Sequence, residues 1–557
     1  MTNRLFYGDN LAVLRQSVDS ESVDLVYLDP PFNSNRAYNI IFRRHDVVAA
    51  DDVSAQIQAF DDTWRWTPVT DEQFKEYTGG GLPNAVSDAL TAFRTLLGEN
   101  DAMAYLVNMA PRLVELHRVL KPTGSLYLHC DQTMSHYLKV LLDAIFGPAA
   151  FGNEIIWKRG HGHNSANRYG RNHDVILYYR RSELATWNAV FQAYDEDYTD
   201  KHYKHIDPAN GRRYKRENPS GAGTRNGATG EPWRGINPTA KGRHWAKTPA
   251  EMDALDAAGK IYWPKKAGAW PYLKLYLDEM PGVPCQGLWI DIDVINMQAA
   301  ERLGYPTQKP LALLERIITA SSNLGDVVLD PFCGCGTTID AAQKLGRGWI
   351  GIDVTYLSVD LVEKRLLHAY GAEIAATYVK AGIPRDKEAA FALFSKSPLE
   401  FERWAVSLLN GQPNERQSGD KGIDGVARFP LGGAGGRLVK GKQKKAELGG
   451  IGRILVSVKG GKIVGPQFVR DLIGTVETQK AELGVLITMA AQTRGVRDAV
   501  DHGGTYTHPG SQQKFSRVQV ISVADLLTGK RPNLPLTQNP YIEARKTVAS
   551  EQTAELF

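Results

Sequence analysis

The most constraining feature of the sequence is a short β-rich run that stops at two consecutive prolines. The run is Val23–Leu28, and Asp29-Pro30-Pro31-Phe32 follows it directly. Proline fixes φ and removes a backbone donor, so the strand must end at Asp29. In open α/β sheets the binding sites lie beyond the carboxyl ends of the strands. The run therefore predicts a strand that ends in a carboxylate on a stiffened loop.

Helix-like and strand-like runs alternate around this feature, which predicts a parallel α/β sheet with crossover helices. Residues 33–100 interrupt the alternation with many turn formers and a glycine triplet, Gly79–Gly81, and we expect a long insertion or lid there. Lys121–Gly124 is expected to be a turn. The expected helices are 11–16, 101–119, 133–146, 310–323, 337–345, 398–409 and 466–480, and the expected strands are 125–129, 154–157, 175–179, 327–329, 348–352, 454–458 and 485–488.

Shifts in composition suggest five parts. Residues 1–184 and 301–385 carry the alternating pattern, and residues 185–300 between them are rich in Gly, Pro, basic and aromatic residues. A second shift follows, with a separate α/β pattern over 395–530 and a polar tail over 531–557.

Bulk composition limits the class of protein only loosely. The chain has 557 residues, four cysteines and a formal net charge of +4. We expect a cytoplasmic protein, because four cysteines form no disulfide framework and no apolar run suggests a membrane span or a secretory signal. The charge permits a nucleic-acid partner but does not require one.

A glycine turn between an expected strand and an expected helix indicates a ligand site. The turn is Asp330-Pro331-Phe332-Cys333-Gly334-Cys335-Gly336-Thr337, and the next strand ends at Asp353. Such a turn lets a ligand approach the backbone, and an acid at the end of the next strand is placed to bind ribose hydroxyls. No Gly-Lys-Ser/Thr follows, so a phosphate-binding loop is not expected. A ligand with ribose but no phosphate fits, and S-adenosylmethionine is one. Two cysteines one residue apart are a poor zinc pattern.

The Asp29 loop suits methylation of an exocyclic amino group. The lone pair of such a nitrogen is delocalised into the base, and acceptors for its two N–H groups would draw it out of conjugation. Asp29 offers a carboxylate and Pro30 a carbonyl, and the prolines Pro30 and Pro31 aim both acceptors in advance. Phe32 can stack on a base that has left the duplex. Pro284-Cys285 resembles the nucleophile motif of cytosine C5 methyltransferases, but no buried strand precedes it, so we interpret it as a turn.

These motifs together resemble the β-group of amino-type DNA methyltransferases, in which the catalytic segment precedes the cofactor segment. The resemblance covers roughly residues 1–375. It implies a Rossmann-like S-adenosylmethionine-dependent fold in which residues 185–300 form a target-recognition insert. The residues that it implies for cofactor binding are Asp9, Asn10, Thr307, Gln308, Lys309, Pro310, Asp330, Pro331, Phe332, Gly334, Gly336, Thr337 and Asp353, and those for catalysis are Asp29, Pro30, Pro31 and Phe32.

The resemblance also implies a substrate and partners. Aspartate first in the catalytic motif is more usual in adenine N6 enzymes, and serine in cytosine N4 enzymes, so we expect methylation of adenine N6 in double-stranded DNA. The alternatives are cytosine N4, RNA as the acceptor, or a bifunctional methyltransferase and Mg²⁺-dependent endonuclease. A homodimer or a separate restriction subunit is a further expectation. In the insert, aromatic and basic residues suit contacts with DNA: Trp233, Arg234, Arg243, Trp245, Lys265 and Lys266.

The C-terminal part resembles the Mrr-like branch of restriction-endonuclease folds. Strand alternation places Ser457 and Lys459 on one face. The resemblance implies that Asp424 binds Mg²⁺, that Lys459 steadies the attacking water, and that Glu402 lies nearby. Members of this branch usually carry Glu or Gln where this chain has Ser457, so the sequence leaves cleavage of DNA open. A nuclease, a sensor of modified DNA and a DNA clamp all fit.

Overall fold

The computed structural model describes residues 2–31, 37–41, 56–61, 64–160, 169–266, 269–296, 299, 301–303, 305, 307–414, 422–431, 450–461 and 463–538. The chain divides into two compact units. One comprises Met1–Asn188 with Gly287–Phe557, and the other is Ala189–Gln286.

Within the described residues, nine strands form the central sheet of the first unit. In spatial order these are β16 (Leu288–Trp289), β6 (Phe151–Lys158), β7 (His173–Arg180), β5 (Leu120–Cys130), β2 (Val23–Leu28), β17 (Val327–Asp330), β18 (Gly348–Asp353), β1 (Asn3–Tyr7) and β19 (Tyr378–Ala381).

The centre of this sheet joins two distant parts of the sequence. Strands β2 and β17 pair in parallel, with Val26 opposite Leu329, so Asp29 and Asp330 follow at the same edge. The carboxylate of Asp24 stabilises this pairing near the amino-terminal ends of the two strands. Its Oδ2 accepts the Val327 N–H at 2.9 Å and contacts the Lys121 ammonium at 2.8 Å.

The sheet is mixed rather than wholly parallel as expected. Strand β7 runs antiparallel to both β5 and β6. The described residues between β6 and β7, 159–160 and 169–172, contain no helix. An antiparallel pair of neighbouring strands needs no crossover helix.

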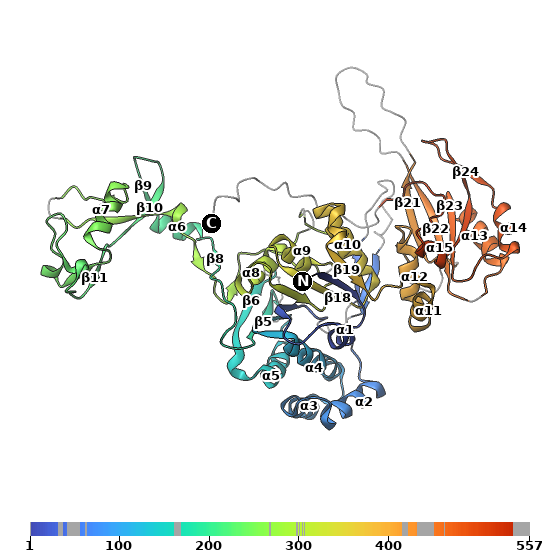
Figure 1. Cartoon of the computed structure of the whole chain (residues 1–557), viewed down its shortest axis with the longest axis horizontal. Helices are drawn as coiled ribbons and strands as arrows, with labels where there is room; N and C mark the ends of the chain where they lie inside the picture. The colour runs from blue at the N-terminus through green and yellow to red at the C-terminus, as the bar shows by residue number, and fades with distance from the viewer. Residues whose placement is uncertain are drawn as a thin grey trace, which may run out of the picture. The chain divides into compact units, whose positions relative to one another are not determined.

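Helices cover both faces of the sheet (Figure 1). On one face lie α1 (Asn10–Ser17), α4 (Asp101–Val119) and α5 (Ser135–Phe146), and on the other α8 (Leu311–Ser321), α9 (Thr337–Lys344) and α10 (Tyr356–Tyr370). Each layer buries its own hydrophobic core against the strands. This Rossmann-like arrangement places the carboxyl ends of β2, β17 and β18 along one edge.

One local expectation was wrong, that of a turn at Lys121–Gly124. The expected insertion at 33–100 contains two helices, α2 (Pro68–Glu76) and α3 (Asn84–Leu97), and α3 buries Val86, Leu90 and Phe93 in the core. The glycine triplet ends the π-helical turn Tyr77–Gly81 between them. Before them, β3 (Ala37–Ile41) and β4 (Gln56–Asp61) pair antiparallel. Lys121–Gly124 lies inside β5, where the register with β2 shifts, and is therefore not a separate turn.

The second unit is built from short strands around a tryptophan core. Its largest described sheet has the order β13 (Ile261–Tyr262), β14 (Tyr272–Tyr276), β10 (Arg213–Glu217) and β9 (His205–Ile206). Trp233, Trp245, Met252 and Ile261 pack together in its interior. The remaining elements are α6 (Glu196–His202), α7 (Pro249–Ala257), β11 (Ser220–Ala222) paired with β12 (Arg243–Trp245), and β8 (Phe191–Gln192) paired with β15 (Val283–Pro284). Pro284 thus lies in a short strand rather than a turn.

The C-terminal domain is a second α/β layer structure. Helices α11 (Lys387–Lys396) and α12 (Pro398–Ser407) precede a sheet ordered β20 (Gln412–Pro413), β21 (Gly425–Pro430), β22 (Ile451–Lys459), β23 (Leu483–Thr488) and β26 (Val518–Ser522). The chain here also forms α13 (Pro466–Thr478), α14 (Arg494–Asp501), α15 (Val523–Leu527) and the pair β24 (Thr505–Thr507) and β25 (Lys514–Ser516). Across all described residues, no helix combines the length and apolarity needed to span a membrane.

Asp24 gives a test of how the two halves of the sheet are joined. We expect Asp24→Ala to lower the free energy of unfolding by about 3 kcal/mol, because it leaves the Val327 N–H and the Lys121 ammonium without their acceptor. Urea unfolding followed by tryptophan fluorescence measures this. The matched control is Asp19→Ala at an exposed position, which should cost no more than about 0.5 kcal/mol. Equal effects of the two variants would contradict the assigned role.

Candidate active site

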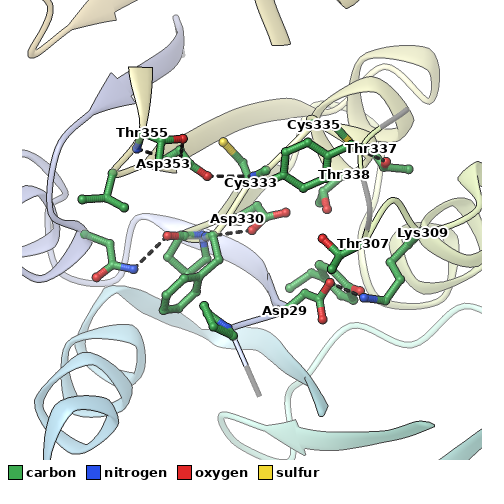
Figure 2. A pocket seen from close by; sticks show the side chains of 18 of the residues that line it. Asp29, Thr307, Lys309, Asp330, Cys333, Cys335, Thr337, Thr338, Asp353 and Thr355 are labelled. Carbon is green, nitrogen blue, oxygen red and sulfur yellow. Dashed lines mark hydrogen bonds and ion pairs between the residues drawn. The ribbon is translucent and has the colours of Figure 1, made fainter. Parts of the chain in front are cut away.

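A cavity of about 380 Å³ opens at the carboxyl ends of β2, β17 and β18. Small-ligand sites commonly have this volume. Figure 2 shows Asp353 toward one end of the cavity, Asp29 toward the other and Asp330 between them. The lining residues are Asp9, Asn10, Tyr27, Asp29, Pro31, Trp64, Asn108, Arg112, Tyr305, Thr307, Gln308, Lys309, Leu314, Asp330, Pro331, Phe332, Cys333, Gly334, Cys335, Thr337, Thr338, Asp353, Val354 and Thr355.

Asp29 lies at the end of β2 and pairs with a lysine from a distant segment. The Lys309 ammonium contacts Oδ2 of Asp29, and both side chains are mostly buried. This contact joins residues that are 280 positions apart in the chain. Lys309 therefore fixes the orientation of the Asp29 carboxylate through its contact with one of the two oxygens. Phe32 lies outside the described residues, and Pro30 is buried and is not among the residues that line the cavity, whereas Pro31 is.

A buried polar network lies behind Asp29. The Tyr27 hydroxyl meets His129 Nδ1 at 2.9 Å, and His129 Nε2 meets Asp174 Oδ2 at 3.0 Å. Burial acts to raise the pKa of Asp174, but the hydrogen bond and charge of His129, helped by Lys309 and Arg159, outweigh it and hold the pKa at about 2. Asp174 is thus an anion that orients His129, and His129 in turn fixes the Tyr27 side chain that lines the cavity.

Two positions of the glycine turn require a residue without a Cβ. Gly334 has φ +48°, and a Cβ there would lie 3.3 Å from the Tyr305 ring. Gly336 has φ +75° and caps α9, and a Cβ there would lie 2.8 Å from Val362. The turn consequently exposes backbone to the cavity, as expected for a ligand that approaches closely.

Two acids beside this turn have strongly perturbed ionisation. Burial raises the pKa of Asp330 to about 7, although hydrogen bonds from Thr338 and the Phe332 N–H oppose the shift. Burial likewise raises the pKa of Asp353 to about 6, against hydrogen bonds from Thr355 and the Gly334 N–H. Burial also raises the pKa of the Cys333 and Cys335 thiols, which therefore stay protonated and are poor metal ligands.

The segment that begins α1 is held by an arginine that the sequence analysis missed. Arg112 pairs with Asp9 Oδ2 at 2.6 Å and donates to Asn10 Oδ1 at 2.6 Å. Asn10 donates to the Pro331 carbonyl at 2.8 Å. Asp9 and Asn10 thus connect α1 and α4 to the glycine turn, and both reach the cavity. Nothing in the neighbouring sequence identifies Arg112, because its partners Asp9 and Asn10 lie about 100 residues away.

The segment before α8 is shaped by Gln308. Its side chain accepts the Leu303 N–H at 2.8 Å and donates to the Glu301 carbonyl at 2.6 Å. Thr307, Gln308 and Lys309 line the cavity as a result, whereas Pro310 caps α8.

The residues present fit S-adenosylmethionine. Acids at the strand ends suit ribose hydroxyls and a cationic ligand, and the Pro331 and Phe332 side chains give an apolar wall. Of the residues expected to bind cofactor, Pro310 and Gly336 are not among those lining the cavity, and the others are. Their individual roles stay predictions. Tyr305, from the segment expected near the methionine end of the cofactor, lines the cavity too, whereas Tyr27, Trp64, Asn108 and Thr355 line it and were not expected.

The C-terminal domain gathers the residues expected around its own site but leaves the acid largely satisfied. Asp424 Oδ2 accepts the Val458 N–H at 2.6 Å and lies 3.6 Å from the Lys459 ammonium. Ser457 donates to the Gly422 carbonyl at 2.6 Å. Glu402 lies on α12. No group of three or more acids, histidines or cysteines suited to a metal occurs among the described residues, which gives the expected Mg²⁺ no support.

Two tryptophans of the insert, Trp233 and Trp245, are structural. Trp233 and Trp245 are buried in the core of the second unit, so the expectation that they contact DNA was wrong for this conformation. Arg234 pairs with Asp253 and Asp256, and Arg243 donates to the Ser220 carbonyl at 2.6 Å. Lys265 and Lys266 are exposed.

Two family profiles match the chain. Residues 23–364 match the family described as DNA methylase, the N6- and N4-methylating enzymes. Residues 400–528 match the family described as NACHT-associated inactive restriction endonuclease 1.

Relatives of known name agree with the first profile. The type II methyltransferase M.EcaI of Enterobacter cloacae is 30% identical over 71% of this chain and 75% of its own length. The Mod subunit of the type III restriction-modification enzyme StyLTI of Salmonella typhimurium is 26% identical over 62% of this chain and 50% of its own length. Among solved structures, the cytosine-N4-specific PvuII DNA methyltransferase aligns at 13% identity over 68% of this chain and 91% of its own, with a TM-score of 0.31, too low to support an inference.

The perturbed Asp353 carboxyl predicts a pH dependence of cofactor binding. Protonation as the pH falls through about 6 removes an acceptor for ribose hydroxyls, so the affinity for S-adenosylmethionine should fall between about pH 8 and about pH 5. Asp353→Asn should bind about tenfold more weakly at pH 8 and lose the pH dependence centred near 6. Isothermal titration calorimetry measures both, with exposed Glu373→Gln as the matched control. Unchanged affinity in Asp353→Asn would refute the role of Asp353.

Proposed function

The chain belongs to the DNA methylase family of N6- and N4-methylating enzymes, and on that premise we propose that it transfers a methyl group from S-adenosylmethionine to N6 of adenine in duplex DNA. We propose further that it serves as the modification enzyme of a restriction-modification system, as its named relatives do.

One observation carries this proposal. Asp29 and the cofactor acids Asp330 and Asp353 face a single cavity from the ends of neighbouring strands, although about 300 residues of sequence separate Asp29 from the other two. A methyl donor held against Asp330 and Asp353 would therefore lie beside a base held against Asp29.

The residues around Asp29 supply what an amino nucleophile needs. When bound, S-adenosylmethionine offers a methyl group on a cationic sulfur. Lys309 contacts Oδ2 of Asp29, so we assign Oδ1 as the acceptor for an N–H of the target amino group. The Pro30 carbonyl accepts the second N–H, and the amino lone pair is then drawn toward the methyl group. The nitrogen must lose one proton after transfer, and Asp29 Oδ1 is placed to take it.

Two observations bear on the choice of base. The first catalytic residue is aspartate, as is more usual in adenine N6 enzymes, and type III Mod subunits occur among the relatives. Cytosine N4 is the alternative, because its amino group would use the same acceptors.

The region between residues 185 and 300 would recognise the DNA sequence, with exposed Lys265 and Lys266 as candidate phosphate contacts. A homodimer or a separate restriction subunit is a further proposal.

Replacement of Asp29 tests the catalytic assignment. Asp29→Ala should lower kcat for transfer of labelled methyl to DNA by at least about a hundredfold, because it removes the acceptor that activates the amino group. Binding of S-adenosylmethionine should change little. The matched control is Asp131→Asn, a carboxylate that follows the neighbouring strand β5 and is not among the lining residues. Near-normal transfer by Asp29→Ala would sink the assignment.

The product identifies the base and the acceptor. Hydrolysis of the labelled DNA should yield 6-methyladenine, and duplex DNA should be a better acceptor than RNA of the same sequence. Recovery of 4-methylcytosine would transfer the proposal to cytosine N4, and a preference for RNA would overturn the choice of substrate.

A further inference from the structure

One helix of the C-terminal domain contacts the loops that hold the cofactor acids. Glu400 lies in the first turn of α12, and its Oε2 accepts the Tyr356 N–H at 3.1 Å. Its Oε1 pairs with Arg403 Nη1 at 2.8 Å. Both side chains are largely buried, with 16% and 8% of their surfaces exposed, so this ion pair is shielded from solvent.

Tyr356 connects this helix to Asp353. Its ring is buried in the core of the C-terminal domain together with Phe401 and Trp404. The residue before it, Thr355, donates to Asp353 Oδ1 at 2.9 Å from both its N–H and its hydroxyl. The segment that lines the cavity at 353–355 is thus held by the glycine turn at its start and by the C-terminal domain at its end.

Tyr7 connects the same helix to the second cofactor loop. It ends β1 directly before Gly8 and Asp9, and its ring packs edge-on against Tyr356 at 6.0 Å. Burial and the charge of Glu400 raise the pKa of the Tyr7 hydroxyl, which therefore stays protonated. Glu400 thus holds the loop after β18 directly, through the Tyr356 N–H, and reaches the loop after β1 through the packing of Tyr7 on Tyr356.

We propose that α12 braces the cofactor pocket, with Glu400 as the positioning residue, so that docking of the endonuclease-like domain and binding of S-adenosylmethionine stabilise each other. The coupling must be reciprocal, because any free energy that docking adds to cofactor binding is returned as tighter docking when cofactor binds. Couplings of this kind typically change affinity by about 5–150-fold. The proposal rests on the cofactor assignment of the pocket and adds a role for the second domain.

Substitution of Glu400 in the full-length protein tests the brace. Glu400→Ala should raise the Kd for S-adenosylmethionine about tenfold, because the Tyr356 N–H loses its acceptor and Arg403 its partner. Its kcat at saturating cofactor should stay near that of the wild type, since Asp29 and Lys309 are untouched. Tyr7→Phe keeps the ring that packs on Tyr356 and removes only the hydroxyl, so its Kd should rise by a smaller factor. Exposed Glu388→Ala on α11 is the matched control and should bind normally.

Hydrogen–deuterium exchange supplies a second readout that a local structural defect would not produce. In the wild type, adding S-adenosylmethionine should slow amide exchange in Pro398–Ser407, and Glu400→Ala should abolish this protection while leaving exchange in Glu388→Ala as in the wild type.

The outcomes separate cleanly. A Kd within twofold of the wild type in both Glu400→Ala and Tyr7→Phe, with no cofactor-dependent protection of α12 in the wild type, overturns the brace. If Glu400→Ala does not fold, Tyr7→Phe and exchange in the wild type decide alone. Absence of S-adenosylmethionine binding by the wild type would instead overturn the cofactor assignment, and the brace with it.

Discussion

The parallel pairing of β2 with β17 is the contact on which the rest of the molecule depends. It joins the strand that ends at Asp29 to the strand that ends at Asp330, across about 300 residues of chain. Polar side chains stabilise the β2–β17 pair at both of its ends. Asp24 links β2 to the Val327 N–H at one end, and the Lys309–Asp29 ion pair closes the other. Because side chains at the carboxyl edge of a sheet are positioned by strand register, a slip of one residue would turn Asp29 to the opposite face. The pairing of β2 with β17 therefore determines where the active-site side chains lie.

The cavity concentrates negative charge that the protein only partly neutralises. Lys309 serves Asp29, whereas burial raises the pKa of Asp330 to about 7 and that of Asp353 to about 6. The folded state holds these two protons more tightly than the unfolded chain does, so their contribution to stability falls as the pH rises from about 4 through about 7. At neutral pH, ionisation of these two buried acids has an electrostatic cost. A ligand with a cationic sulfur and donor hydroxyls relieves that cost, which favours S-adenosylmethionine over a phosphate-bearing cofactor.

The sequence was sufficient for features that depend on neighbouring residues and insufficient for those that depend on distant ones. Strand ends followed by proline or glycine located Asp29, Asp330 and Asp353, because turn chemistry is local. The pairing of Lys309 with Asp29 was missed, since it joins segments 280 residues apart. The helices α2 and α3 were missed because a glycine triplet suggested a loop, whereas burial of Leu90 and Phe93 overrides that propensity. Burial also explains the error over Trp233 and Trp245, because composition alone does not distinguish a tryptophan in a core from one on a binding surface.

The C-terminal domain shows how a fold can persist without its expected chemistry. A hard cation such as Mg²⁺ needs about six oxygen ligands. Asp424 has one oxygen committed to the Val458 N–H and close to Lys459, and Ser457 directs its hydroxyl to a backbone carbonyl. The matching family is itself described as inactive. A domain of this fold can act through its surfaces as well as through a metal site. The surface in use here is α12, whose Glu400 carboxylate meets the backbone of the cofactor loop. The C-terminal domain can therefore influence cofactor binding in the first domain. The contacts involved are the buried Glu400–Arg403 ion pair and the side chains of Tyr356 and Tyr7.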